Sequence, residues 1–142
     1  MKESAKGDVG VAQVTSDLIT KGYEILLPVS ASSPYDMVIC KNNKFYKVQV
    51  KYRENHKGYI KLEQRRLVKG GKTQKHRRMR EDEVDLYAIY CPDTKEVYYV
   101  NPVSVKNQMA ITLRLDISPN YRATKAARYA KDYLSLDFLT SD

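Results

Sequence analysis

The sequence predicts a single α/β domain, with a mixed β-sheet flanked by helices and a basic ribbon or loop inserted into it. The chain has 142 residues, enough for one domain with a proper core and too few for two. Apolar residues recur at helical spacing near the N-terminus and at alternate positions in several later segments, which indicates both helices and strands. The net charge of +8 is concentrated in one stretch between these elements, so we interpret that stretch as an insertion.

The first predicted element is an amphipathic helix over residues 8–21. Asp8 suits its N-terminal cap or first turn, and Gly22 suits its C-terminal cap, where a left-handed backbone is common. Its apolar residues recur at three- and four-residue spacing, so they share one side of the helix. They are Val11, Val14 and Leu18.

Two short strands are predicted over residues 23–28 and 36–40, joined by a loop of small residues. Asn42 and Asn43 tolerate a positive φ and mark a tight turn after the second strand. Residues 44–52 then form the clearest strand of the chain, because their side chains alternate between two faces. One face carries Tyr46, Val48, Val50 and Tyr52, and the other carries Phe45, Lys47, Gln49 and Lys51.

The basic residues gather between positions 57 and 80. This segment contains ten Lys and Arg residues and one acid, Glu63, so the rest of the chain is close to neutral. A separate basic element is what binding to a polyanion requires, whereas a solvated loop has no reason to exclude acids so completely. We therefore expect residues 57–82 to be a basic, DNA-binding insertion within a single domain that spans 1–142.

Two structures fit the sequence of this insertion. One is a β-ribbon with a strand over 58–68, a hairpin turn at Gly70 and Gly71, and a return strand over 72–80. The other is a helix over 62–69, and the sequence leaves both open.

The second half of the chain is predicted to contain a hairpin, a strand and a helix. Residues 85–90 and 96–100 form the hairpin around Pro92, Asp93 and Thr94. Its tyrosines are either a subunit interface or part of the core. They are Tyr87, Tyr90, Tyr98 and Tyr99.

Residues 111–117 alternate apolar and polar side chains, as in a strand with one buried face. Asn120 is expected to cap a final helix over 121–133. The tail 134–142 is apolar at alternate positions, which makes it a candidate contact with another subunit.

Three polar residues form the candidate catalytic site. Asp36 opens one strand, and the turn brings Gln49 and Lys51, on one face of the next strand, back beside it. A carboxylate and an amide oxygen can hold a hard cation such as Mg²⁺, and a lysine can position a water or offset charge on a phosphoryl group. Each residue alone is typical of a turn or a solvent-facing strand. The three together, beside a basic arm, indicate a site that hydrolyses phosphodiesters.

Other classes of protein are disfavoured. Cys40 and Cys91 have no CxxC or histidine cluster around them, so neither structural zinc nor a disulfide framework is indicated. The sequence shows no signal peptide and no apolar run of roughly 20 residues that would span a membrane. We expect a bacterial cytoplasmic protein that is nucleoid-associated when bound to DNA.

The order of these motifs resembles the PD-(D/E)XK nucleases, which have the restriction-endonuclease fold. It includes a first helix, Pro34-Tyr35-Asp36 and then Gln49-Val50-Lys51. The likeness is greatest to a branch represented by a cyanobacterial group I intron-encoded homing endonuclease, and it covers about residues 6–133. Segments beyond the core carry it too. These are Lys6-Gly7-Asp8-Val9-Gly10, Lys21-Gly22-Tyr23, Asp85 with the hairpin after it, and Ile111-Thr112-Leu113-Arg114-Leu115.

The resemblance implies a site-specific, double-strand DNA homing endonuclease with a restriction-endonuclease-like core and a Mg²⁺ cofactor that Mn²⁺ can replace. It makes Asp36 and Gln49 the metal ligands and Lys51 the motif lysine, although relatives usually have Glu or Asp where Gln49 stands. Many relatives also have a glutamate on the first helix where this chain has Val11. Asp8 is the only nearby substitute, and a helix cap suits it better. We therefore expect weak metal binding or impaired catalysis.

The insertion would supply DNA recognition, since Lys and Arg neutralise phosphates and Arg and Gln side chains can read base edges. His56 is expected to contact phosphate. The other candidate DNA-binding residues are Lys57, Lys61, Gln64, Arg65, Arg66, Lys69, Lys72, Gln74, Lys75, His76, Arg77, Arg78 and Arg80.

Cutting both strands needs two active sites, so a homo-oligomer is expected, at least a dimer and by resemblance up to a tetramer. Two alternatives stay open. One is a structure-specific nuclease like the Holliday-junction resolvases, and the other is a non-catalytic DNA- or RNA-binding protein descended from a nuclease.

Overall fold

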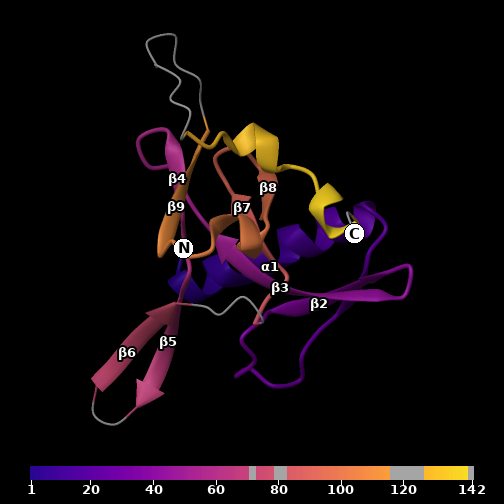
Figure 1. The fold of residues 1–142 in the computed structure, drawn as a ribbon, viewed down its shortest axis with the longest axis horizontal. Coiled ribbons are helices and arrows are strands. Elements are labelled where there is room, and N and C mark those ends of the chain that lie inside the picture. Colours follow the sequence, from indigo (N-terminus) through magenta and orange to yellow (C-terminus); the bar gives the residue numbers. More distant parts are fainter. Residues whose placement is uncertain (71–72, 79–82, 116–126, 141–142) are drawn as a thin grey trace.

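The computed structural model describes residues 1–70, 73–78, 83–115 and 127–140. For 65–70 and 73–78 it describes the backbone only. Figure 1 shows the arrangement, with one long helix lying across one face of a central sheet. The elements are α1 (Glu3–Thr20), β1 (Glu24–Leu26), β2 (Met37–Lys41), β3 (Lys44–Tyr52), β4 (Tyr59–Glu63), β5 (Arg65–Gly70), β6 (Thr73–Arg78), β7 (Leu86–Cys91), β8 (Glu96–Val100), the 3₁₀ helix η1 (Pro102–Val105), β9 (Ala110–Arg114), and the 3₁₀ helices η2 (Ala130–Tyr133) and η3 (Asp137–Leu139).

Helix α1 begins five residues earlier than the sequence pattern predicts. It starts at Glu3 after an extended Lys2, so Asp8 is an exposed residue of the helix interior, and the prediction that it caps the helix is wrong. The first turn is held by Lys6, whose ammonium group lies 3.2 Å from Glu3 and 3.0 Å from Glu54 at the end of β3. This bridge links the first turn to the chain after β3, and the apolar periodicity alone does not indicate that turn.

The C-terminal end of α1 is as predicted. Gly22 has a φ of +93°, its N–H donates to the carbonyl of Ile19, and the N–H of Tyr23 donates to the carbonyl of Leu18. This pattern of two bonds around a left-handed residue is the Schellman motif, and it closes the helix where a side chain at Gly22 would be strained. It also directs the chain back along the sheet into β1.

The central sheet has five strands in the order β1-β2-β3-β7-β8. Strands β3 and β7 run parallel, and the other neighbours are antiparallel. Asn42 and Asn43 form the predicted tight turn between β2 and β3, with φ values of 54° and 62°. Their two-residue loop makes Lys41 the partner of Lys44, and the same register makes Met37 the partner of Val48.

Two apolar clusters lie on opposite faces of this sheet. The first packs α1 against the sheet and includes Val14 and Leu18 of the helix with Val48 of β3. The second fills the space between the other face of β7 and β8 and the small β4–β9 sheet. All six residues of β7 are buried, and they contribute alternately to the two clusters. Strands β3 and β7 are therefore rigidly supported next to the candidate site.

The tyrosines of the hairpin belong to this core, so the prediction that they form a subunit interface is wrong. Their side chains are between 1% and 7% exposed, which leaves no surface for a partner. The sequence could not decide between the two interpretations because an amphipathic tyrosine suits both environments. The residues are Tyr87, Tyr90, Tyr98 and Tyr99.

The inserted segment is a β-structure, and the alternative helix over 62–69 is wrong. The predicted single strand over 58–68 is divided at Gln64 into β4, which pairs with β9, and β5, which pairs with β6. In Figure 1 the β5–β6 ribbon projects away from the body of the protein. Residues 71–72, including the predicted turn residue Gly71, and residues 79–82 lie outside the described residues.

The predicted final helix over 121–133 is wrong for its last part, residues 127–133, which contain an extended Tyr129 and a single short 3₁₀ helix. Residues 116–126, with the expected cap Asn120, lie outside the described residues. Beyond them Tyr129 is extended and forms a bridge with Arg114, and only the short η2 follows. A backbone paired to the end of β9 cannot be helical at the same position.

The tail 134–142 packs on its own chain as far as the structure describes it, to residue 140. Leu136 is buried in the first cluster, Phe138 and Leu139 pack against it, and the carbonyl of Leu139 accepts a hydrogen bond from the hydroxyl of Tyr46. This packing accounts for the apolar residues, and the subunit contact stays a prediction. Among the described residues no helix is long and apolar enough to cross a membrane.

Candidate active site

The candidate site lies where β2 ends beside β3. The last pair of the β2–β3 ladder joins Met37 to Val48, and one further bond runs from the N–H of Asp36 to the carbonyl of Val48. Beyond this point β3 continues to Tyr52 with a strand neighbour on the β7 side. The side chain of Asp36 takes the place of β2 there, because its Oδ2 accepts the N–H of Val50 at 2.7 Å.

Asp36 and Gln49 meet as the sequence predicts. The amide nitrogen Nε2 of Gln49 donates to Oδ2 of Asp36 at 2.9 Å. Partial burial raises the pKa of the Asp36 carboxyl, while the Val50 N–H and the charge of Lys51 act in the opposite direction. The carboxyl is thus held in place by two donors in a half-buried position at the edge of the sheet.

Lys51 lies on the same face of β3 as Gln49, and Val50 is buried on the core side, as predicted. Burial lowers the pKa of the Lys51 ammonium group, and the neighbouring charge of Arg53 lowers it further, against the pull of Asp36 and Glu63. Within the described residues Lys51 forms no hydrogen bond or ion pair. Its ammonium group is therefore free to bind a ligand.

Arg53 is a site residue that the sequence analysis missed. It is half-buried, and its guanidinium group is fixed by two backbone carbonyls, Nε to Lys61 at 3.0 Å and Nη1 to Tyr52 at 2.9 Å. Burial lowers its pKa, and Glu63 partly opposes this effect. Its spacing of two from Lys51 was the available signal, since alternate residues of a strand share a face.

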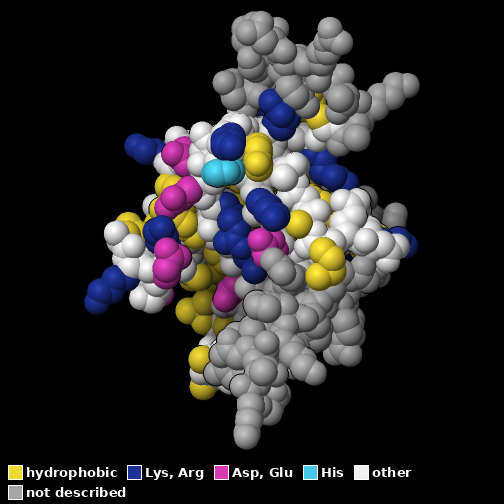
Figure 2. Space-filling model, turned by 90° about the vertical axis from the view of Figure 1, so that its left-hand side faces the viewer, with side chains coloured by type: hydrophobic (Ala, Val, Ile, Leu, Met, Phe, Trp, Pro, Cys, Tyr) yellow, Lys and Arg dark blue, Asp and Glu magenta, His cyan; other side chains and the backbone are white. Residues whose placement is uncertain are grey.

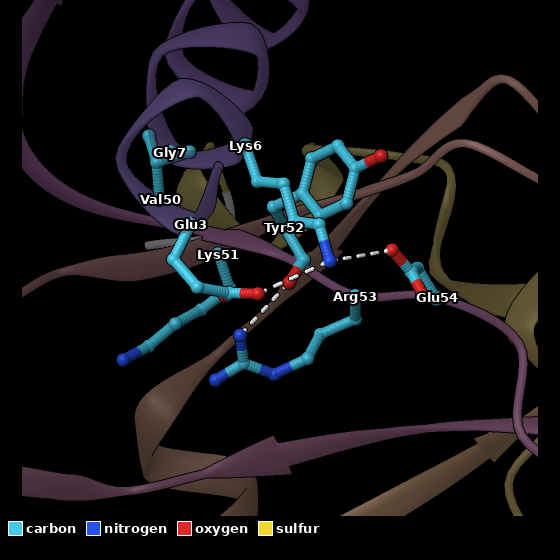
Figure 3. Close-up of a pocket in the computed structure, with 8 residues that line it drawn as sticks. All are labelled: Glu3, Lys6, Gly7, Val50, Lys51, Tyr52, Arg53 and Glu54. Atoms are coloured by element: carbon cyan, nitrogen blue, oxygen red, sulfur yellow. Dashed lines mark hydrogen bonds and ion pairs between the residues drawn. The ribbon is translucent and has the colours of Figure 1, made fainter. Parts of the chain in front are cut away.

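An open cleft of about 340 Å³ extends from Lys51 towards the first turn of α1. Figure 3 shows that Lys6 lies between Glu3 and Glu54 on one side of this cleft, while the side chains of Lys51 and Arg53 extend on the other side. The remaining residues that line it are Gly7, Val50 and Tyr52.

The position of Val11 agrees with the structural role expected for it. The side chain is half-buried and packs against the first apolar cluster, so it contributes to the core and offers no metal ligand. Helix α1 passes close to β3 at Gly10, where a Cβ would lie at ordinary contact distance from the strand, 3.4 Å from Cγ1 of Val50 and 3.5 Å from Cβ of Tyr52. The exposed Asp8 does not line the cleft, so it does not replace the missing glutamate.

The oxygens present suit a weakly held hard cation. Asp36 Oδ1 and Gln49 Oε1 accept no hydrogen bond from the described residues, and carboxylate and amide oxygens are ligands that Mg²⁺ accepts while it keeps several waters. No group of three His, Cys, Asp or Glu side chains that could hold a metal occurs in the described part of the chain. Metal binding at Asp36 and Gln49 therefore stays a prediction, with one carboxylate and one amide oxygen as the donors.

The predicted DNA-binding residues at the start of the insertion differ in their exposure to solvent. Lys57 is exposed at a turn with a φ of 54°, Lys61 is exposed on β4, and His56 is exposed and pairs with Tyr59 through the backbone. Gln64 is 4% exposed, so the prediction that it contacts DNA is wrong.

Gln64 instead fixes a loop inside the protein. Its Nε2 donates to the carbonyls of Val105 at 2.8 Å and Gln108 at 2.7 Å, and its Oε1 accepts the hydroxyl of Tyr87 at 3.3 Å. It lies where the chain passes from β4 to β5, and the sequence gives no sign that this one residue turns inward. The buried amide ties this junction to the loop after η1.

Most of the other predicted DNA-binding residues lie on the β5–β6 ribbon, where the backbone register is defined. Arg65 pairs with Arg78, Arg66 with Arg77, Leu67 with His76, Val68 with Lys75 and Lys69 with Gln74. Lys72 and Arg80 lie outside the described residues. Figure 2 shows a face of the molecule on which described Lys and Arg side chains gather at the centre with acidic side chains beside them.

Fold and site together define a nuclease of the restriction-endonuclease type. The family model for PD-(D/E)XK endonucleases matches residues 1–136, and the chain therefore belongs to the PD-(D/E)XK endonuclease family. The family predicted from the sequence is confirmed. The comparison with curated proteins finds no match.

Among solved structures, the chain is similar to that of a bacterial homing endonuclease, I-Ssp6803I, with a TM-score of 0.76. The match covers 99% of this chain and 93% of that one at 17% sequence identity. It confirms the restriction-endonuclease-like fold predicted from the sequence.

Proposed function

We propose that this endonuclease is a metal-dependent, site-specific enzyme of homing type that hydrolyses phosphodiesters in both strands of duplex DNA. The observation that carries the proposal is the meeting of Asp36, Gln49 and Lys51 at the open edge of β3. The likeness to a homing endonuclease and the projecting basic ribbon support it.

In this proposal Asp36 and Gln49 hold the cation through their oxygens. Rotation of the Gln49 amide by half a turn about its last bond would exchange Nε2 for Oε1 beside Asp36, so both side chains would present oxygen. When bound, Mg²⁺, or Mn²⁺ in its place, supplies Lewis-acid chemistry at a phosphoryl oxygen. The donor set has one carboxylate, so we expect activity only at roughly millimolar Mg²⁺.

Lys51 acts on the attacking water and on the developing charge. Its ammonium group can donate a hydrogen bond that holds the water in line, and its charge offsets the negative charge that builds up on the phosphoryl oxygens.

We also propose that duplex DNA contacts the basic insertion and that the enzyme works as a homo-oligomer, because each strand needs its own active site. The tail 134–142 is retained as the candidate subunit contact. Phosphate contacts from the ribbon would make binding depend strongly on salt concentration.

The test is cleavage of plasmids that carry random inserts, with Mg²⁺ or with EDTA, by the wild-type protein and by a Lys51→Ala variant. We expect discrete metal-dependent cuts by the wild type, and we expect Lys51→Ala to lose cutting while it still binds DNA. Cutting at micromolar Mg²⁺ would contradict the weak metal site.

The same assay separates the alternatives. A marked preference for four-way junctions over linear duplexes would favour a structure-specific nuclease like the junction resolvases. The absence of cutting at any metal concentration, together with tight and salt-sensitive binding, would favour a non-catalytic DNA- or RNA-binding protein.

A further inference from the structure

We propose that the cleft between the first turn of α1 and the end of β3 binds a phosphate group of the DNA backbone next to the phosphate that is cut, and that Arg53 is its anchor. The proposal rests on the proposed function only in taking DNA as the ligand. It requires neither a metal nor cleavage.

The first reason is that Arg53 carries a charge to which no acid is bound among the described residues. The side chain is half-buried, and within the described residues it forms no ion pair. The nearby acid Glu63 acts on Arg53 electrostatically without an ion pair to it, and it forms an ion pair with Lys61 at 3.7 Å. A charge removed from water without a partner destabilises a fold, so its retention is best explained by a ligand that neutralises it.

The second reason is geometric. Two carbonyls, those of Lys61 and Tyr52, fix the plane of the guanidinium group through Nε and Nη1. Nη2 and one N–H of Nη1 have no acceptor among the described residues. A planar group held in this way and with donors left over is suited to grip two oxygens of one phosphate.

The third reason is the distribution of charge in the cleft. Lys51 lies two residues before Arg53 on the same face of β3, and it too has no acid bound to it among the described residues. Lys6 is different, since its ammonium group is bound by Glu3 and Glu54 at the rim (Figure 3). The attraction for a phosphate is therefore concentrated at Lys51 and Arg53.

The positions of Lys51 and Arg53 along the cleft suggest which phosphates of the cut DNA strand each residue would contact. Lys51 would face the reacting phosphate, which Asp36 and Gln49 also approach, and Arg53 would hold a neighbouring phosphate further along the cleft. A second fixed phosphate removes freedom from the substrate, so it fixes which bond lies at the catalytic site.

The experiment measures binding of a short DNA duplex of random sequence in EDTA, over a range of salt concentrations, with the full-length chain. For Arg53→Gln we expect affinity to fall about tenfold and the slope of log K against log salt to become shallower by about 0.9, the loss of one phosphate contact. Arg53→Lys keeps the charge and should keep the slope. The matched control is Lys106→Gln, which removes an exposed charge outside the cleft and should leave the slope unchanged.

Three results would overturn the proposal. One is an unchanged slope in Arg53→Gln with a lower melting temperature, which would show a purely structural role. The second is an equal loss of slope in Arg53→Lys, and the third is an equal loss in Lys106→Gln. Because EDTA excludes cleavage, failure here is distinct from failure of the proposed nuclease activity, which is read from cutting with Mg²⁺.

Discussion

Gln64 lies between β4 and β5, Gln49 lies within β3, and their hydrogen bonding differs in one respect. Gln64 is buried, and both its donor and its acceptor atoms are bonded within the protein, to Val105, Gln108 and Tyr87. Gln49 donates one hydrogen bond to Asp36, and its oxygen has no donor among the described residues. This difference in hydrogen bonding distinguishes polar groups that stabilise the fold from polar groups that are available to bind a ligand.

The same contrast extends to charged residues. Asp17 on α1 is bonded to Lys21 at 2.8 Å and accepts the hydroxyl of Tyr99, so its charge is matched inside the fold. Lys51 and Arg53 are half-buried with no acid bound to them in the described residues. If this contrast is functional, removing satisfied groups should lower stability, and altering the unsatisfied ones should change ligand binding.

The largest effect is expected for Gln64→Ala. The carbonyls of Val105 and Gln108 would lose their donor in a buried site, which should lower the free energy of unfolding by about 2–3 kcal/mol. Urea denaturation measures this. Gln108→Ala is the matched control, because its exposed side chain leaves the backbone carbonyl in place and should change stability by less than about 0.5 kcal/mol. Equal stability of both variants would contradict the structural role of Gln64.

Val11→Glu introduces the first-helix glutamate that the resemblance to PD-(D/E)XK nucleases implies as a metal ligand. We expect the Mg²⁺ concentration needed for half-maximal cleavage to fall about tenfold, because a second carboxylate raises the affinity of an oxygen site for a hard cation. Metal titration of the cleavage rate measures it. The control is Val11→Gln, because glutamine has nearly the shape of glutamate without its charge. It should leave the Mg²⁺ concentration for half-maximal cleavage close to that of the wild type. A similar gain in both variants would exclude metal binding as the cause.

Tyr99→Phe removes a satisfied hydrogen bond and little else. Asp17 keeps Lys21 as its partner, so we expect a loss of about 1 kcal/mol in the free energy of unfolding and no change in DNA affinity. Thermal unfolding and DNA binding are the two measurements. A loss of DNA affinity without a loss of stability would mean that this cluster belongs to the binding surface.

The smallest expected effect is the change in melting temperature caused by Lys51→Met. Burial and the charge of Arg53 lower the pKa of Lys51 in the folded state, so the folded state tolerates the charged ammonium group less well than the unfolded state does. The stability that the neutral form confers is present above the unfolded pKa of about 10.5 and is lost as pH falls through the lowered folded pKa. Lys51→Met should therefore melt slightly above the wild type at pH 7, and the gain should shrink towards pH 10.5. A lower melting temperature at pH 7 would show that the lysine stabilises the fold.

Local features of the chain were predictable where short-range rules apply. The Asn42-Asn43 turn fixed the register of β2 and β3, and this register placed Asp36 beside Gln49. Alternation along β3 assigned Val50 to the core and Lys51 to the other face. The first turn of α1 was missed because it carries no apolar periodicity, and its contact with the rest of the fold, from Lys6 to Glu54, lies outside the helix.

The sequence by itself determined the family, the hairpin that builds the site and the segregation of charge into one insertion, because these depend on residue order, turn chemistry and alternation. The tertiary structure alone decided which polar residues are free. Gln64 turns inward to a loop more than 40 residues away in the chain, and Arg53 is oriented by the carbonyl of Lys61 on another strand. Such assignments depend on burial and on long-range partners, which no local pattern of residues encodes.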